Sequence, residues 1–425
     1  MAYILNDPTI FEPEYLYSGK EISINVLDIY ELSVGDNIFD REFLAVRWAI
    51  QKGIESILYI LYMEGAASAG NIKWLEYLRN RGIQWNWKTT EKAAKNGHLD
   101  CLIYLHEEGC SWDWKTTEKA AQYGHLDCLQ YAHEEGCDWG ESTCTEAAGE
   151  GHLDCLVYAH EQGCSWNEST CSVAARSGHL DCLQYAHEEG CTWDEDVCRY
   201  SASNGHLDCL RYAHEEGCLW PTGVCTYAAE NGHLNCLIYL HEEGCPWDKW
   251  TCVYAAENGH LNCLIYAHEE GCKWDIQTCS SAAENGHLDC LRYAHEQGCP
   301  WDEKTCKMAT FNGHLDCLIY LHENGCPWNK EVCEMAARSD YLDCLIYAHE
   351  NGCPWDEESY SFAIGFGSLN CLRYLYENNC PWKAWLCNAP ELSYEHHILA
   401  YLNSVGLCIG YTYEDSSEYD ESSSW

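Results

Sequence analysis

The chain has 425 residues and a formal net charge of −44 with histidine counted as neutral. That charge repels nucleic-acid phosphates and anionic lipid head groups, so it argues against nucleic-acid or membrane binding and favours basic or mixed-charge protein partners. Hydrophobic residues make up 47% of the chain, which excludes wholesale disorder. No apolar run approaches the ~20 residues that a membrane span needs, and the N-terminal sequence has no secretory signal pattern. We therefore expect a cytoplasmic monomer whose 32 cysteines are mostly reduced thiols.

The first 66 residues lack the periodicity of the rest of the chain. Within them, the stretch FLAVRWAIQKGIESILYILYMEG begins at residue 43 and is apolar enough for a helical cap or an irregular first repeat. Residues 1–66 are therefore expected to form a separate N-terminal segment.

Residues 67–408 repeat one unit of 27 residues, about 12 to 13 times. A fixed period of this size without insertions predicts a solenoid, in which each repeat packs on its neighbours. The register extends back to Gly70 and forward, in weaker form, to Asp340 and Gly367. The tripeptide Gly-His-Leu marks it most clearly and begins at Gly97, Gly124, Gly151, Gly178, Gly205, Gly232, Gly259, Gly286 and Gly313.

One repeat, residues 247–273, predicts a pair of helices. Asp248 suits a helix N-cap, and residues 249–258 carry the small side chains of a closely packed first helix. Asn258-Gly259 ends that helix, a second helix follows over residues 260–270, and Gly271 ends it in turn. The fold class is therefore all-α, an αα-hairpin repeat solenoid.

The second helix is amphipathic. At ~100° per residue, one group of side chains falls on an arc of roughly 160° around the helix, and the others fall on the opposite side. The buried side is expected to carry Leu99, Cys101, Leu102, Leu105 and His106, and the solvated side Asp100, Ile103, Glu107 and Glu108. The repeated Glu pair lies at the helix C-terminus, where the helix dipole disfavours it, and supplies much of the negative charge.

The segment AAENGHLNCLIYLHEEGCPWD, residues 228–248, resembles the second half of an ankyrin repeat. Cys236-Leu237 and Leu240-His241 take the family's paired aliphatic positions, and Cys245 takes the alanine after its glycine. The unit is shorter than the family's roughly 33 residues, and T-C replaces the family's T-P-L-H start. The resemblance therefore implies an ankyrin-like array whose β-hairpin fingers are shortened or absent.

The same resemblance implies a function. Ankyrin repeats imply a non-enzymatic scaffold that binds a protein partner, with no catalytic residues and no cofactor. Tandem Cys- and Trp-rich units further resemble the ankyrin-like proteins of large DNA viruses of amoebae. That resemblance implies a viral or host-interaction adaptor in the host cytoplasm, with a host protein or a ubiquitin-ligase component as partner.

A zinc-binding or redox-sensing Cys/His protein is the alternative function. Cys101-x4-His106-x3-Cys110 has suitable zinc ligands. However, the first two lie about 140° apart on one helix, and the two cysteines lie ~13 Å apart if the segment stays helical. A metal site shared between repeats stays open, although no metal ligand is predicted.

Thiol chemistry and disulfides give further alternatives. His98, Asp100 and Cys101 supply a base, an orienting group and a nucleophile, but nine repeats share them, which indicates a fold requirement. Equivalent cysteines of neighbouring repeats should lie ~10 Å apart, too far for ladders of disulfides. Pairs between different positions, such as Cys137 and Cys144, stay open.

Tryptophan recurs at the same period and is expected to form a packing column between repeats rather than a ligand-binding stripe. Its positions are Trp85, Trp112, Trp139, Trp166, Trp193, Trp220, Trp247, Trp274, Trp301, Trp328, Trp355 and Trp382.

Two positions vary freely between repeats, one directly after the Trp-Asp pair and one four residues later. Their i, i+4 spacing puts both on one face of the first helix. Because the invariant positions serve packing, we expect this variable first-helix face to bind the partner. The predicted contact residues are Trp87, Glu91, Trp114, Glu118, Arg199, Val253, Ile276 and Lys307. Residues 409–425 are acidic and Ser-rich and are expected to be a disordered tail.

Overall fold

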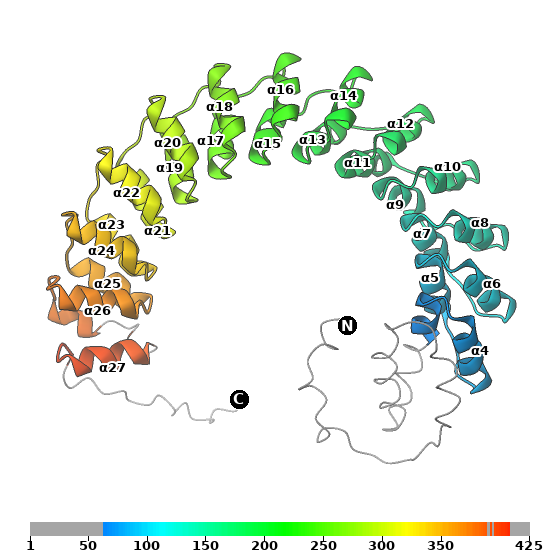
Figure 1. Cartoon of the computed structure of the whole chain (residues 1–425), viewed down its shortest axis with the longest axis horizontal. Helices are drawn as coiled ribbons and strands as arrows, with labels where there is room; N and C mark the ends of the chain where they lie inside the picture. The colour runs from blue at the N-terminus through cyan, green and yellow to red at the C-terminus, as the bar shows by residue number, and fades with distance from the viewer. Residues whose placement is uncertain (1–62, 389–391, 393–394, 409–425) are drawn as a thin grey trace, which may run out of the picture. The chain divides into compact units, whose positions relative to one another are not determined.

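The computed structural model describes residues 63–388, 392 and 395–408. Over these residues it contains helices and no strand, so the predicted all-α class is confirmed (Figure 1). The predicted segment up to residue 62 and the acidic tail of residues 409–425 lie outside the described part of the chain. None of the described helices is both long and apolar enough to span a bilayer.

Each repeat contributes a first and a second helix, joined by a turn at Gly-His-Leu or its equivalent. The first helices are α5 (Trp87–Lys95), α7 (Trp114–Gln122), α9 (Thr143–Gly149), α11 (Glu168–Ser177), α13 (Asp196–Ser203), α15 (Val224–Glu230), α17 (Lys249–Glu257), α19 (Ile276–Glu284), α21 (Glu303–Phe311), α23 (Glu331–Arg338) and α25 (Glu357–Gly365). The second helices are α4 (Ile72–Asn80), α6 (Leu99–Glu107), α8 (Leu126–Glu134), α10 (Leu153–Glu161), α12 (Leu180–Glu188), α14 (Leu207–Glu215), α16 (Leu234–Glu242), α18 (Leu261–Glu269), α20 (Leu288–Glu296), α22 (Leu315–Glu323), α24 (Leu342–Glu350) and α26 (Leu369–Glu377). The 3-10 helix η3 (Ala384–Asn388) and α27 (His396–Ser404) follow.

The helix boundaries follow from capping. The Asp248 carboxylate accepts a hydrogen bond from the Trp250 amide at 3.0 Å and starts α17. After α18, Gly271 has φ of 86°, and the Cys272 amide donates to the Ala267 carbonyl at 2.8 Å. The predicted N-cap and helix ends are therefore confirmed to within one residue at each end.

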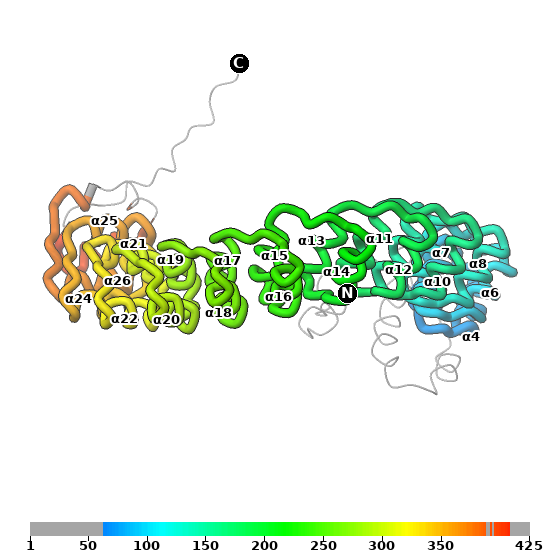
Figure 2. The backbone as a smooth tube through the Cα atoms, turned by 90° about the horizontal axis from the view of Figure 1, so that it is seen from above, coloured from blue at the N-terminus to red at the C-terminus, as the bar shows by residue number. Residues whose placement is uncertain are grey.

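The described helices fall into two compact units, one of residues 63–197 with 211–218 and the other of residues 198–210 with the described residues from 219 to 408. Within the first unit, α5, α7, α9 and α11 pack side by side, and α6, α8, α10 and α12 form a second, less closely packed row (Figure 1). Within the second unit the same two rows recur, with α15, α17, α19 and α21 in one row and α16, α18, α20 and α22 in the other (Figure 2).

The core between the rows is built from small and aliphatic side chains. In α6, Cys101, Leu102 and Leu105 are buried, and in α5, Ala93 and Ala94 are buried. Alanine and cysteine let the first helices approach closely, because helix spacing is set by the side chains at the contact. The predicted buried side of the second helix is thus confirmed for these residues, whereas Leu99 and His106 are only half-buried.

The histidines of Gly-His-Leu join successive repeats. The His98 ring makes a hydrogen bond through Nε2 to the Ser68 carbonyl at 3.0 Å. The His125 ring does the same with the Lys95 carbonyl at 3.2 Å. Each ring therefore satisfies a carbonyl at the C-terminal end of the previous repeat's first helix, where helix carbonyls lack intrahelical partners.

Candidate interaction surface

The first of the two variable positions lies at the N-terminus of each first helix. Trp87 begins α5, Trp114 begins α7 and Ile276 begins α19. Trp114 is 42% exposed, whereas Trp87 and Ile276 are half-buried. The residue before this position caps the helix, as at α7, where the Asp113 carboxylate accepts a hydrogen bond from the Lys115 amide at 3.0 Å. This position is accessible to a partner.

The second variable position is less exposed than predicted. Val253 is only 2% exposed and Glu118 only 7% exposed. The Ser142 hydroxyl, at the N-terminus of the neighbouring first helix, donates to the Glu118 carboxylate. Glu118 also lies 3.3 Å from the Lys119 ammonium. Val253 and Glu118 are therefore too buried to offer contact surface, and Glu118 lies against the start of the next first helix.

The charged members of the second position make contacts within the array. The Lys307 ammonium, in α21, lies 3.1 Å from the Glu331 carboxylate at the start of α23. The Arg199 guanidinium lies over the Tyr200 ring, 4.9 Å from its centroid. Glu91 lies 3.6 Å from the Lys92 ammonium. These three side chains are half-buried and contact other residues of the array, so a substitution at any of them would also change packing.

A group of tryptophan and lysine side chains stands out on α5 and α7. We call Trp87, Lys88, Trp114 and Lys115 the Trp–Lys surface. The Lys115 ammonium lies 4.8 Å from the Trp87 ring centroid and 5.5 Å from that of Trp114. The Lys88 ammonium lies 5.6 Å from the Trp87 ring. One lysine thus bridges two aromatic rings from adjacent first helices through cation–π contacts.

Positive charge is concentrated on the same two helices. α5 and α7 together carry five of the chain's 24 lysines and arginines, namely Lys88, Lys92, Lys95, Lys115 and Lys119. The sequence prediction included both tryptophans but missed these lysines. The sequence feature that could have identified them is the octapeptide WKTTEKAA, which occurs in both helices and in no later repeat.

Negative charge gathers elsewhere, at the C-terminal end of the second helices. Glu107 and Glu108 are exposed, as are their equivalents Glu134 and Glu135. Burial, reinforced by Glu135 and Glu107, raises the pKa of the Tyr131 hydroxyl. The acidic edge is therefore a separate feature from the first-helix face.

The remaining aromatic side chains pack against one another. The His106 ring stacks on Trp112 at 4.0 Å between centroids, and its Nδ1 is hydrogen-bonded to the Tyr131 hydroxyl at 3.0 Å. The Trp112 ring meets Tyr131 edge-on at 6.2 Å. The same stack and hydrogen bond recur at His160, His187, His241, His268, His295, His322 and His349. In these repeats the tryptophan packing therefore includes a histidine and a tyrosine.

Cys101, His106 and Cys110 pack and form hydrogen bonds within the array. Burial, with a smaller contribution from Asp100, raises the pKa of the Cys101 thiol to about 11, which opposes the thiolate that a nucleophile needs. The Cys110 thiol donates to the Asn86 carbonyl at 3.4 Å. Over the described residues, no group of three or more His, Cys, Asp or Glu side chains is placed to hold a metal ion.

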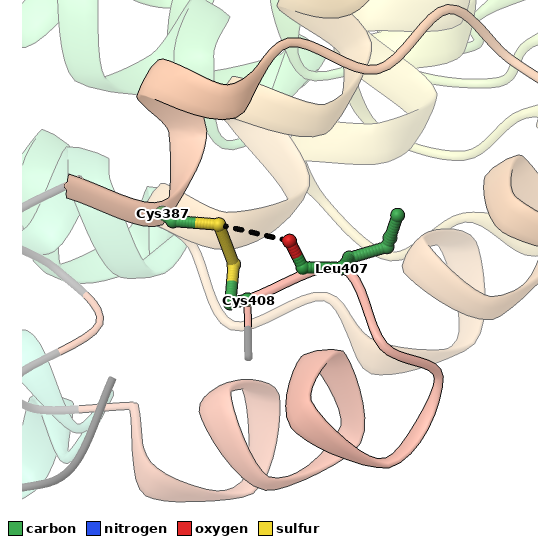
Figure 3. The surroundings of a disulfide bond; sticks show 3 residues. All are labelled: Cys387, Leu407 and Cys408. Carbon is green, nitrogen blue, oxygen red and sulfur yellow. Dashed lines mark hydrogen bonds between the residues drawn. A yellow bond between two sulfur atoms is a disulfide. The ribbon is translucent and has the colours of Figure 1, made fainter. Parts of the chain in front are cut away.

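A disulfide joins Cys387 and Cys408, whose Cα atoms lie 5.5 Å apart (Figure 3). The sequence prediction of mostly reduced thiols did not foresee this bond. The pair left open there, Cys137 and Cys144, is not joined, and both remain buried thiols.

Comparison with curated proteins finds no match for this chain. Among solved structures, 168 chains match. One of them is described as the crystal structure of the human ASB11 ankyrin repeat domain, with 18% identity, a TM-score of 0.33, and coverage of 37% of this chain and 84% of that chain. The family model described as ankyrin repeats in many copies matches residues 279–322. Over this segment the chain is therefore similar to ankyrin repeats, and the same 27-residue unit continues on both sides of it.

Proposed function

We propose that the chain is a non-enzymatic scaffold that binds a protein partner through the first-helix face, with the Trp–Lys surface as its centre. The observation that carries this proposal is the exposed Trp114 ring beside Lys115 and Trp87. Tryptophan is enriched among the residues that contribute most to binding at the centre of protein interfaces. Ankyrin repeats in general mediate protein–protein interaction, which supports the same reading.

The chemistry of the surface describes the partner. Lysines beside aromatic rings attract a carboxylate that is flanked by an apolar or aromatic side chain. The acidic edge, with Glu107 and Glu108, repels a partner that is acidic throughout. The surface therefore fits a mixed-charge protein segment with a short acidic-aromatic motif. The resemblance of the Cys- and Trp-rich units to viral ankyrin-like proteins supports a host protein as its source.

A displayed peptide library tests this proposal. The full chain should enrich peptides in which Asp or Glu flanks an aromatic or aliphatic residue. Trp114→Ala should weaken binding of those peptides by at least about tenfold, as expected for an interface hot spot. Higher salt should weaken binding further, because the lysine contacts are screened.

Trp250→Ala is the matched control. Trp250 is 39% exposed, and its ring lies 5.0 Å from the Lys249 ammonium, but it stands outside the Trp–Lys surface. This variant should bind the selected peptides like the wild type. If the Trp114→Ala variant bound the selected peptides as tightly as the wild type, at unchanged thermal stability, the Trp–Lys surface would not be the binding site.

A further inference from the structure

Two cysteines of the same repeat lie together in the core, one in the first helix and one just after the second helix. In the repeat of α9 and α10 these are Cys144 and Cys164. The Cys144 thiol donates to the Cys164 carbonyl at 3.8 Å. The same contact to the carbonyl recurs at 3.9 Å from Cys171 and from Cys279, and at 4.0 Å from Cys225.

We call each such pair a repeat dithiol. Its members are 20 residues apart and both buried. Seven repeat dithiols have both members in the same compact unit, namely Cys144 with Cys164, Cys171 with Cys191, Cys225 with Cys245, Cys252 with Cys272, Cys279 with Cys299, Cys306 with Cys326, and Cys333 with Cys353.

The disulfide between Cys387 and Cys408 occupies the same place in the last repeat. Cys387 stands in the 27-residue register of Cys144, and its sulfur lies 3.3 Å from the carbonyl oxygen of Leu407, 20 residues later (Figure 3). One extra residue after Gly406 moves the second cysteine from position 407 to 408. The bonded pair thus shows the oxidised form of an arrangement that the other repeats hold as thiols.

We propose that the seven repeat dithiols are disulfide-forming sites, so that an oxidant closes one bond within each repeat, between its first helix and the end of its second helix. This proposal concerns the core and is independent of the binding surface on the first helices. It makes the array a multi-site acceptor of oxidising equivalents, with a low-molecular-weight disulfide as the oxidant class.

The two thiols of a repeat dithiol are chemically unequal. The proximity of the two thiols lowers the pKa of Cys164 and raises that of Cys144. The Cys164 thiolate attacks one sulfur of the external disulfide and forms a mixed disulfide, while one external thiolate leaves. Cys144 then loses its proton and attacks the Cys164 sulfur, which expels the second external thiolate. In total two protein thiols and one external disulfide give one protein disulfide and two external thiols.

The chain contains its own negative controls. Thr90 and Thr117 replace the first-helix cysteine in the repeats of Cys110 and Cys137. The third cysteine of each repeat, such as Cys155 in α10, belongs to no repeat dithiol, and burial raises its pKa to about 12. These cysteines should form no disulfide within their own repeat.

Glutathione disulfide provides the test. The full chain is reduced under native conditions, freed of reductant, and incubated with increasing glutathione disulfide. It is then alkylated, digested and mapped by mass spectrometry. We expect disulfides between the members of the repeat dithiols, a loss of two thiols per bond, and a rise in apparent Tm. Cys144→Thr copies the residue of the first two repeats and should abolish only the bond to Cys164, which then carries a glutathione adduct.

Two outcomes would overturn the proposal. The first is that Cys387–Cys408 re-forms while the seven repeat dithiols stay reduced. The second is that bonds join cysteines of different repeats, or that glutathione adducts collect on Cys155 and its equivalents. A Cys155→Ser variant serves as the control. It removes the third cysteine of the repeat and should leave the bond between Cys144 and Cys164 unchanged.

Discussion

The turn between the two helices of a repeat offers a sharp test of how repeats stack. Gly259 has φ of 76°, in the left-handed region, and a Cβ atom built on it would lie 2.5 Å from Nδ1 and 2.9 Å from Cγ of His287 in the next repeat. Because Cγ is bonded directly to Cβ, rotation of the ring moves this atom little. The whole His287 side chain would have to leave its position to relieve the clash. Gly259→Ala should therefore both strain the backbone and push the next repeat away.

The cost has two parts. A non-glycine residue in the left-handed region costs roughly 1–2 kcal/mol. Overpacking against the ring costs about 1–3 kcal/mol more. Gly271→Ala isolates the first part, since Gly271 has φ of 86° but nothing within 4 Å of its built Cβ. We expect Gly259→Ala to lower the free energy of unfolding by about 1–3 kcal/mol more than Gly271→Ala.

Urea unfolding followed by circular dichroism gives the global loss. Because stability in a repeat array is carried by neighbouring interfaces, hydrogen exchange at α18 and α20 should show the local effect. His287→Ser in the Gly259→Ala background should recover the packing part of the loss, measured against His287→Ser alone. Equal losses for the two glycine variants, or no recovery by His287→Ser, would refute the stacking argument.

Three further predictions concern caps, ion pairs and pH. Asp248→Ala removes the acceptor for the Trp250 amide and should cost about 0.5–2 kcal/mol in urea unfolding. Asp248→Asn should cost little, because asparagine caps α5 and α11. Lys307→Glu separates a partly exposed ion pair with Glu331 and should lower Tm slightly, for a loss of at most about 1 kcal/mol. Adding Glu331→Lys should restore it; an unchanged Tm in the single variant would show that the pair contributes nothing. Burial raises the pKa of buried thiols such as Cys155 to about 12 from an ordinary value of 9, so the folded chain keeps protons that the unfolded chain releases. The urea midpoint should therefore be highest below pH 9 and fall as the pH rises toward 12, and a flat profile over that range would contradict the assignment.

The helix pairs followed from local chemistry, which is why they could be predicted. Asp248 and Gly271 set the ends of their helices through contacts within a few residues. The buried positions of the second helix followed from its 3.6-residue periodicity. Neither inference needed knowledge of the next repeat.

The variable first-helix face shows where such reasoning stops. Spacing of i, i+4 correctly places two side chains on one face, but it does not say what lies against that face. In the structure the second position is buried at Glu118 and Val253, and at Glu118 it lies against the next first helix, whereas Trp114 is exposed. The lysines of α5 and α7 were missed because a rule based on variable positions gave no weight to two repeats that agree with each other.

Departures from the repeat carry information when they occur in related pairs. Asp340 stands where Gly-His-Leu repeats have glycine, with φ of 56°, and 28 residues later Ser368 replaces the histidine that would lie against it. The Asp340 carboxylate instead accepts a hydrogen bond from the Cys371 amide at 2.9 Å. A side chain is tolerated at this turn where the ring that would collide with it is absent. The same logic applies to Cys387 and Cys408, where one extra residue moves the second cysteine by one position and the pair is bonded. Compensated departures of this kind mark the contacts between and within repeats, and the uncompensated ones, Trp87 and Trp114 with their lysines, mark the surface that packing does not explain.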